Sequence, residues 1–346
     1  MVWCTLIAAM FLSLSALPSE GQTVPAPDAA FLAIVDTYRE GRMADAIGAL
    51  SQWPEARVHG LASTRDRLRE LGGVRVKAAI MLHTDVAFAL SVAHPTLSNR
   101  HVDLARALTQ GLAKTPAGSL FKERWLATAV VVYLFRRDLR LAQFAVNLAL
   151  DDGPDGRDLL LIGGTLLERR ALAASSDIRG QWTLDPAIRG RMEHDLLDAA
   201  QRYERALQMD ADFFPARLRL GWVHLINRSL QRAREQLTIV RDHTTEADIA
   251  YLAHLMLGAL EEREMRPEAA LMEYEAAHAI APEAQTGRVA VIHAARAAGK
   301  VERARALAAE ISERPAMTVD DPWWYFSFGL TGAEALRWLR DEALAR

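Results

Sequence analysis

Small residues recur along this chain at intervals of about 34 residues, the length of two short helices with their turns. Ala199, Ala233, Ala270 and Ala304 follow one another at nearly this interval, with a slightly longer step from Ala233 to Ala270. A short helical pair cannot bury its apolar face alone, so pairs repeated at such an interval must stack on one another. The interval therefore predicts a stack of helix pairs instead of one globular core.

Nearly all of the chain after residue 29 shows helical periodicity, and strand signals are nearly absent. The abundant Ala, Leu, Arg and Glu are good helix formers. Gly and Pro stand between the periodic segments and mark their ends. We expect two helices that turn at Gly41, followed by helices near 55–71, 74–91, 98–114, 119–137, 139–151, 156–174, 193–209, 214–228, 230–242, 247–264, 267–280, 284–298 and 301–313.

One unit carries a recognisable set of residues at fixed spacing, namely Leu257-Gly258, Ala270, Tyr274, Ala277 and Pro282. This set resembles the tetratricopeptide repeat, whose period matches the interval between the small residues. Small residues at the helix crossings of such a unit let the backbones approach, and bulky residues fill the gaps. The resemblance implies an all-α, right-handed α-solenoid of antiparallel helix pairs.

The resemblance is closest over 194–313, looser over 119–173 and loosest before that. His254 and Glu261 stand where the repeat often has Trp and Tyr. Another α-solenoid with less regular pairs is therefore the alternative fold. The run at 78–90 and the terminal "DPWW" resemble an exported group of tetratricopeptide proteins, a likeness that implies no chemistry.

The N-terminus has the features of an export signal. Val2 to Leu17 form an apolar run of signal-peptide length, and small residues place a cleavage site near Gly21. We expect a signal peptide at 1–21, a linker at 22–29 and a periplasmic or secreted mature chain. A buried N-terminal helix is the alternative. Cys4 is the only cysteine, so the mature chain would form no disulfide.

Three further regions complete the predicted organisation. Degenerate helical pairs occupy 30–118, and tetratricopeptide-like repeats occupy 119–313, with an insertion at 174–193. That insertion, which carries Trp182, is either a surface excursion or a lid over the concave face. An aromatic-rich helical cap follows at 314–346, where Asp321 with Pro322 opens a helix. This stretch either covers the end of the last repeat or forms a partner-binding aromatic patch.

No catalytic, cofactor or metal signature is present in the sequence, so we expect a protein that is not an enzyme. His83, His94 and His101 come closest to a metal cluster, but Pro95 breaks the helix between them. A formal net charge of −3 gives no general attraction to nucleic acid. No apolar run after the signal is long enough to cross a bilayer.

The resemblance implies a binding groove lined by the first helix of each unit. We therefore predict an exported scaffold that binds a peptide or protein segment, with no cofactor and with an oligomeric state that the sequence does not reveal. The alternative is a small-molecule or envelope-component binder, with or without hydrolytic activity, built around the 174–193 insertion. The predicted contact residues come from three first helices: Arg219, Trp222, Glu262, Arg263, His293 and Arg296.

Overall fold

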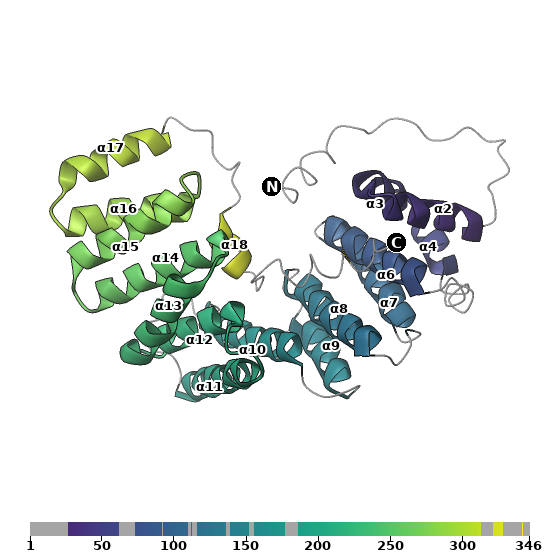
Figure 1. Cartoon of the computed structure of the whole chain (residues 1–346), viewed down its shortest axis with the longest axis horizontal. Coiled ribbons are helices and arrows are strands. Elements are labelled where there is room, and N and C mark those ends of the chain that lie inside the picture. The colour runs from purple at the N-terminus through teal and green to yellow at the C-terminus, as the bar shows by residue number, and fades with distance from the viewer. Residues whose placement is uncertain are drawn as a thin grey trace. The chain divides into compact units, whose positions relative to one another are not determined.

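A computed structural model describes residues 27–61, 73–91, 93–109, 112, 116–135, 139–151, 156–176, 186–312, 321–327 and 341. Every regular element within these residues is a helix, as the periodicity predicts (Figure 1). None of the described helices is both long and apolar enough to cross a lipid bilayer.

The described helices divide into two compact units. The first unit contains α2 (Pro27–Arg39), α3 (Met43–Ser51), α4 (Glu55–Leu61), α6 (Gly73–Leu90), α7 (Pro95–Thr109), α8 (Pro116–Phe135) and α9 (Leu139–Asp151). The second contains α10 (Arg157–Ser176), α11 (Pro186–Met209), α12 (Phe214–Ile226), α13 (Leu230–His243), α14 (Ala247–Arg263), α15 (Pro267–Ile280), α16 (Gln285–Ala297), α17 (Val301–Ser312) and α18 (Pro322–Ser327).

Unit 2 is a series of helix pairs. α10 packs on α11, α12 on α13, α14 on α15 and α16 on α17. The second helix of each pair packs on the first helix of the next, and successive first helices also touch. This order confirms the expected stacking of pairs, and Figure 1 shows the same succession from α10 to α17.

The closest crossings depend on glycine. A Cβ atom added to Gly258 in α14 would lie 2.4 Å from Cε1 of Tyr274 in α15. A Cβ added to Gly164 in α10 would lie 2.5 Å from the same ring atom of Tyr203 in α11. Both distances are far below van der Waals contact, so each crossing excludes even a methyl group. The two pairs therefore use the same small-against-aromatic arrangement.

The turns inside successive pairs repeat as well. Arg228, Met265 and Gly299 have positive φ angles of 57°, 57° and 75°, and each stands one repeat after the previous one. After each, the next N–H donates to a carbonyl five residues back, as Lys300 does to Ala295 at 2.7 Å. This hydrogen bond closes a Schellman turn at the end of each first helix.

The division between the two units follows residue 153, after the end of α9. One helix start differs from the expected position. α11 begins at Pro186, ahead of the expected start at 193, since proline suits the first turn of a helix. Residues 177–185, which include Trp182, lie outside the described residues.

The described part of the C-terminal stretch lies on the first helices of unit 2. α18 packs against α14, and its side chains and carbonyls reach α12 and α10 (Figure 1). Residues 313–320 and 328–340 lie outside the described residues, so a cap over the last pair stays a prediction. The opening of a helix at Asp321 is confirmed, because its Oδ1 accepts a hydrogen bond from the Trp323 N–H at 3.0 Å.

Candidate peptide-binding wall

The first helices α10, α12, α14 and α16 present one continuous set of contacts to residues 321–327. We call their side chains and termini that touch this segment the α18 site. The site has hydrogen-bond donors to a carboxylate at one end, aromatic rings at its centre, and donors to main-chain carbonyls at the other end. Its residues are Arg169, Arg219, Trp222, Tyr251 and Thr286.

The first end of the α18 site holds the Asp321 carboxylate. The Thr286 N–H, in the first turn of α16, donates to its Oδ2 at 2.7 Å, and the Tyr251 hydroxyl donates to its Oδ1 at 3.2 Å. Tyr251 in turn accepts from the Gly287 N–H at 3.0 Å. A helix N-terminus favours a negative charge, so this end selects a carboxylate. Burial, and then the charge of Asp321, raise the pKa of Tyr251, which keeps it a hydrogen-bond donor.

The centre of the α18 site is aromatic. The Trp222 ring on α12 meets Trp323 and Phe326 edge-on, with centroid distances of 5.4 and 6.0 Å. Trp323 and Phe326 stack on each other at 5.7 Å. Such arrangements are favourable beyond the area they bury. Trp324, between them in the sequence, is 50% exposed.

The far end binds main-chain oxygens. Arg219 donates from Nη2 to the Phe326 carbonyl at 3.0 Å, and its guanidinium lies 4.2 Å from the centre of the Phe326 ring. Arg169 donates to the Ser327 carbonyl. Charged donors make the stronger hydrogen bonds, and carbonyls are present in any peptide. This end therefore adds affinity without reading sequence.

A buried network fixes Arg219 in this orientation. Glu168 on α10 accepts from Arg219 Nη1 at 3.0 Å and from the Tyr203 hydroxyl at 2.9 Å. Arg219 is 0% exposed and Glu168 is 2% exposed. Burial, and then the charge of Glu168, raise the pKa of Tyr203, so it stays protonated and donating. The guanidinium is thereby oriented before any segment arrives.

The six predicted contact residues fall into two groups. Arg219 and Trp222 belong to the α18 site, and Arg219 cannot reach a partner while residues 321–327 are in place. Glu262, Arg263, His293 and Arg296 form what we call the open patch, on α14 and α16. The three basic members of this patch are exposed.

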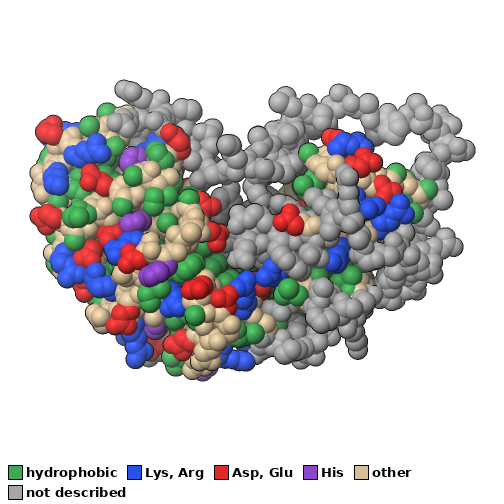
Figure 2. All heavy atoms as spheres, viewed as in Figure 1, with side chains coloured by type: hydrophobic (Ala, Val, Ile, Leu, Met, Phe, Trp, Pro, Cys, Tyr) green, Lys and Arg blue, Asp and Glu red, His purple; other side chains and the backbone are tan. Residues whose placement is uncertain are grey.

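The open patch is polar and of mixed charge. His293 Nδ1 lies 2.9 Å from Glu262 Oε1, which joins α16 to α14. Arg263 donates to the Leu225 carbonyl. Acidic and basic side chains are interspersed over the face of unit 2 in Figure 2. The patch can therefore offer directional donors from α16 to an extended segment.

A histidine pair lies in unit 1. His83 on α6 and His101 on α7 approach to 2.8 Å between their Nδ1 atoms, and His83 stacks on Phe31 with centroids 5.1 Å apart. The turn at Pro95 folds α7 back along α6, so the proline that separates these histidines in sequence brings them together. His94, the third histidine considered, is exposed. The pair is a hydrogen-bonded core contact.

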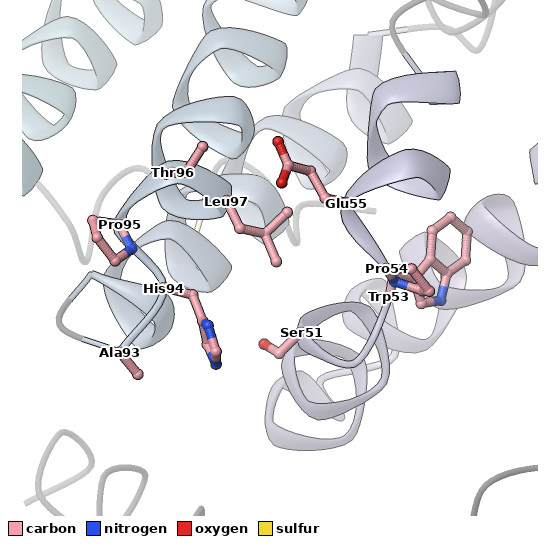
Figure 3. A pocket seen from close by; sticks show the side chains of 9 residues that line it. All are labelled: Ser51, Trp53, Pro54, Glu55, Ala93, His94, Pro95, Thr96 and Leu97. Carbon is pink, nitrogen blue, oxygen red and sulfur yellow. The ribbon is translucent and has the colours of Figure 1, made fainter.

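A cavity of about 500 Å³ lies in unit 1, between the end of α3 and the start of α7 (Figure 3). Figure 3 shows the Ser51 and His94 side chains pointing toward one another across it. The lining of the cavity mixes polar and apolar residues: Ser51, Trp53, Pro54, Glu55, Ala93, His94, Pro95, Thr96 and Leu97.

A scan against models of protein families found no match, and a search of curated proteins found none either. In the structure, Arg219 and Trp222 of α12 both contact Phe326. The repeat register does not indicate this contact, because it joins residues that are far apart along the chain.

Proposed function

We propose that this protein is an exported, non-catalytic scaffold that binds a peptide or protein segment along the wall formed by α10, α12, α14 and α16. The scaffold would be a right-handed solenoid of tetratricopeptide-like repeats, acting in the periplasm or outside the cell. The observation that carries the proposal is the segment 321–327, which this wall already holds through its carboxylate, aromatic rings and carbonyl oxygens.

The contacts support peptide binding because they match how proteins recognise short segments. Main-chain oxygens receive charged donors, which supply affinity for any peptide, and a few anchoring side chains supply selectivity. Trp and Arg are the residue types most often found at binding hot spots. The α18 site has both, and the open patch next along the first helices extends the available surface with exposed charges.

Peptide display on the full chain tests this function. A library of random peptides is selected against the immobilised wild-type protein, and the affinities of enriched peptides are measured by fluorescence anisotropy. We expect the double variant His293→Glu/Arg296→Glu, which reverses charge on the open patch, to weaken peptides that contact this patch by roughly tenfold.

The matched control is Arg303→Glu/Arg305→Glu on α17, a second helix, where both arginines are exposed. This variant should bind the same peptides as the wild type does. Failure to enrich any peptide, or an equal loss in both variants, would count against the proposed function.

A further inference from the structure

The segment 321–327 behaves as a ligand that is tethered to its own binding site. Its helix, α18, has six residues, fewer than an isolated helix needs to be stable in water. It is ordered by the wall: Asp321 and Phe326 are each 2% exposed. Two of the wall residues that hold it are also held by the wall itself. Arg219 is bonded to Glu168, and the Tyr251 hydroxyl accepts from the Gly287 N–H. These two groups are therefore positioned by contacts that do not involve the segment.

The contacts of the segment define a recognition pattern. Asp321 fills the carboxylate end, and Trp323 and Phe326 fill the aromatic centre, two and five positions later. Trp324, at an intervening position, is half exposed and contributes less to the fit. The site thus selects an acidic residue followed by aromatic residues at the second and fifth positions after it.

We propose that the α18 site accepts, in trans, a partner-protein segment with this acidic-x-aromatic-x-x-aromatic pattern, and that residues 321–327 occupy the site until the partner displaces them. The inference rests on the proposed function and names its partner. Charge supports the acidic position of this pattern. The α16 N-terminus and the Tyr251 hydroxyl both donate hydrogen bonds there, and a carboxylate accepts both.

Because residues 321–327 are part of the same chain, a partner peptide must displace them to bind, and only peptides that fit the site well can do so. A covalently linked segment acts at a high effective concentration, so a free peptide must compete with it. The apparent dissociation constant then rises by the inverse of the fraction of molecules whose site is open. Loosening the segment should therefore tighten binding of a free peptide.

The test uses a labelled peptide of residues 321–327 with two glycines at each end, and the full chain. In the opened variant, Trp323→Ser/Phe326→Ser, the tethered segment loses its aromatic contacts with Trp222. We expect this variant to bind the peptide roughly tenfold or more tightly than the wild type does, by anisotropy. The same peptide carrying Asp321→Asn or Phe326→Ser should bind the opened variant several times more weakly.

Trp324→Ser is the control, since it changes a half-exposed tryptophan of the same segment and should leave peptide affinity at the wild-type value. Circular dichroism checks that each variant is folded. If the double variant does not fold, Asp321→Ala replaces it, with a smaller gain expected. A folded, opened variant that binds the peptide no better than the wild type would overturn the proposal.

The result also separates this inference from the proposed function. Display-selected peptides that bind the wild type, together with an opened variant that binds the 321–327 peptide no better than the wild type does, would overturn the inference and leave the function standing. If neither the wild type nor the opened variant binds any peptide, both fail.

Discussion

Single glycines determine how closely the helices of unit 2 approach. The Tyr274 ring, 5% exposed, lies where a Gly258 side chain would be. We expect Gly258→Ala to lower the free energy of unfolding by about 1–3 kcal/mol, because a buried ring must shift. Gly190→Ala in α11, where an added Cβ meets nothing within 4 Å, is the control and should stabilise by up to about 1 kcal/mol. Thermal melts of both variants measure the difference. Equal shifts of the melting temperature in Gly258→Ala and Gly190→Ala would contradict the close crossing at Gly258.

The buried histidine pair predicts a dependence of stability on pH. Burial lowers the pKa of His101 to about 4, and burial together with the charge of His101 lowers that of His83 well below its usual value. In the unfolded chain both would titrate near pH 6.5. The unfolded state therefore binds more protons between these values, and acid favours it. The stabilisation is present above about pH 6.5 and is lost as the pH falls toward about 4.

Thermal melts of the full chain at pH 7 and pH 4.5 measure this effect. The drop should reach a few kcal/mol at most, since one pKa unit corresponds to about 1.4 kcal/mol. The variant His83→Leu/His101→Leu removes both titrating groups and should flatten the dependence. His94→Leu, at an exposed histidine, should leave it unchanged. An unaltered pH dependence in the double variant would rule out the pair as its source.

Two of the repeated turns between helices carry a residue that does not suit them. Met265 has a φ of 57°, which costs an L-residue roughly 1 kcal/mol or more, and its side chain is 85% exposed. Met265→Gly removes this strain without loss of packing, so we expect a higher melting temperature. Gly299 occupies the equivalent turn at 75°, and Gly299→Ala should lower the melting temperature. Changes of the same sign in both variants would exclude this account of the turns.

Most helix boundaries in unit 2 could be predicted, because residues close together in the sequence determine where a helix begins and ends. α12 to α17 begin and end within two residues of the expected positions, and Pro215, Pro267, Pro282 and Gly299 mark several of these ends. α18 on the wall and the paired histidines were not predictable. Both depend on contacts between residues of different helices. Local periodicity carries no information about such contacts, for example that of Arg219 with Phe326.

Export of the chain is a prediction that depends on residues 1–21, the expected signal peptide. We expect a mature protein that begins near Gln22 after expression with the natural N-terminus in a bacterium. Cell fractionation and N-terminal sequencing measure this. Leu12→Arg, which interrupts the apolar run, should leave the uncleaved chain inside the cell. A wild-type chain that keeps Met1 and stays in the cytoplasm would contradict export.

Each of the two units has its own buried side chains, and this predicts two unfolding transitions. Phe31 and Trp125 are buried in unit 1, whereas Tyr203 and Tyr251 are buried in unit 2. Contacts that concentrate within units favour separate melting, so calorimetry of the full chain should show two transitions.

Variants in each unit identify which transition belongs to which unit. Gly258→Ala should move one transition by several degrees, because about 1 kcal/mol shifts the melting temperature of a unit this size by roughly 2–4 °C. His83→Leu/His101→Leu should alter the pH response of the other transition and leave the first in place. A single transition that both variants move together would instead mean that the two units unfold as one cooperative body, with coupling between them as strong as the packing inside each.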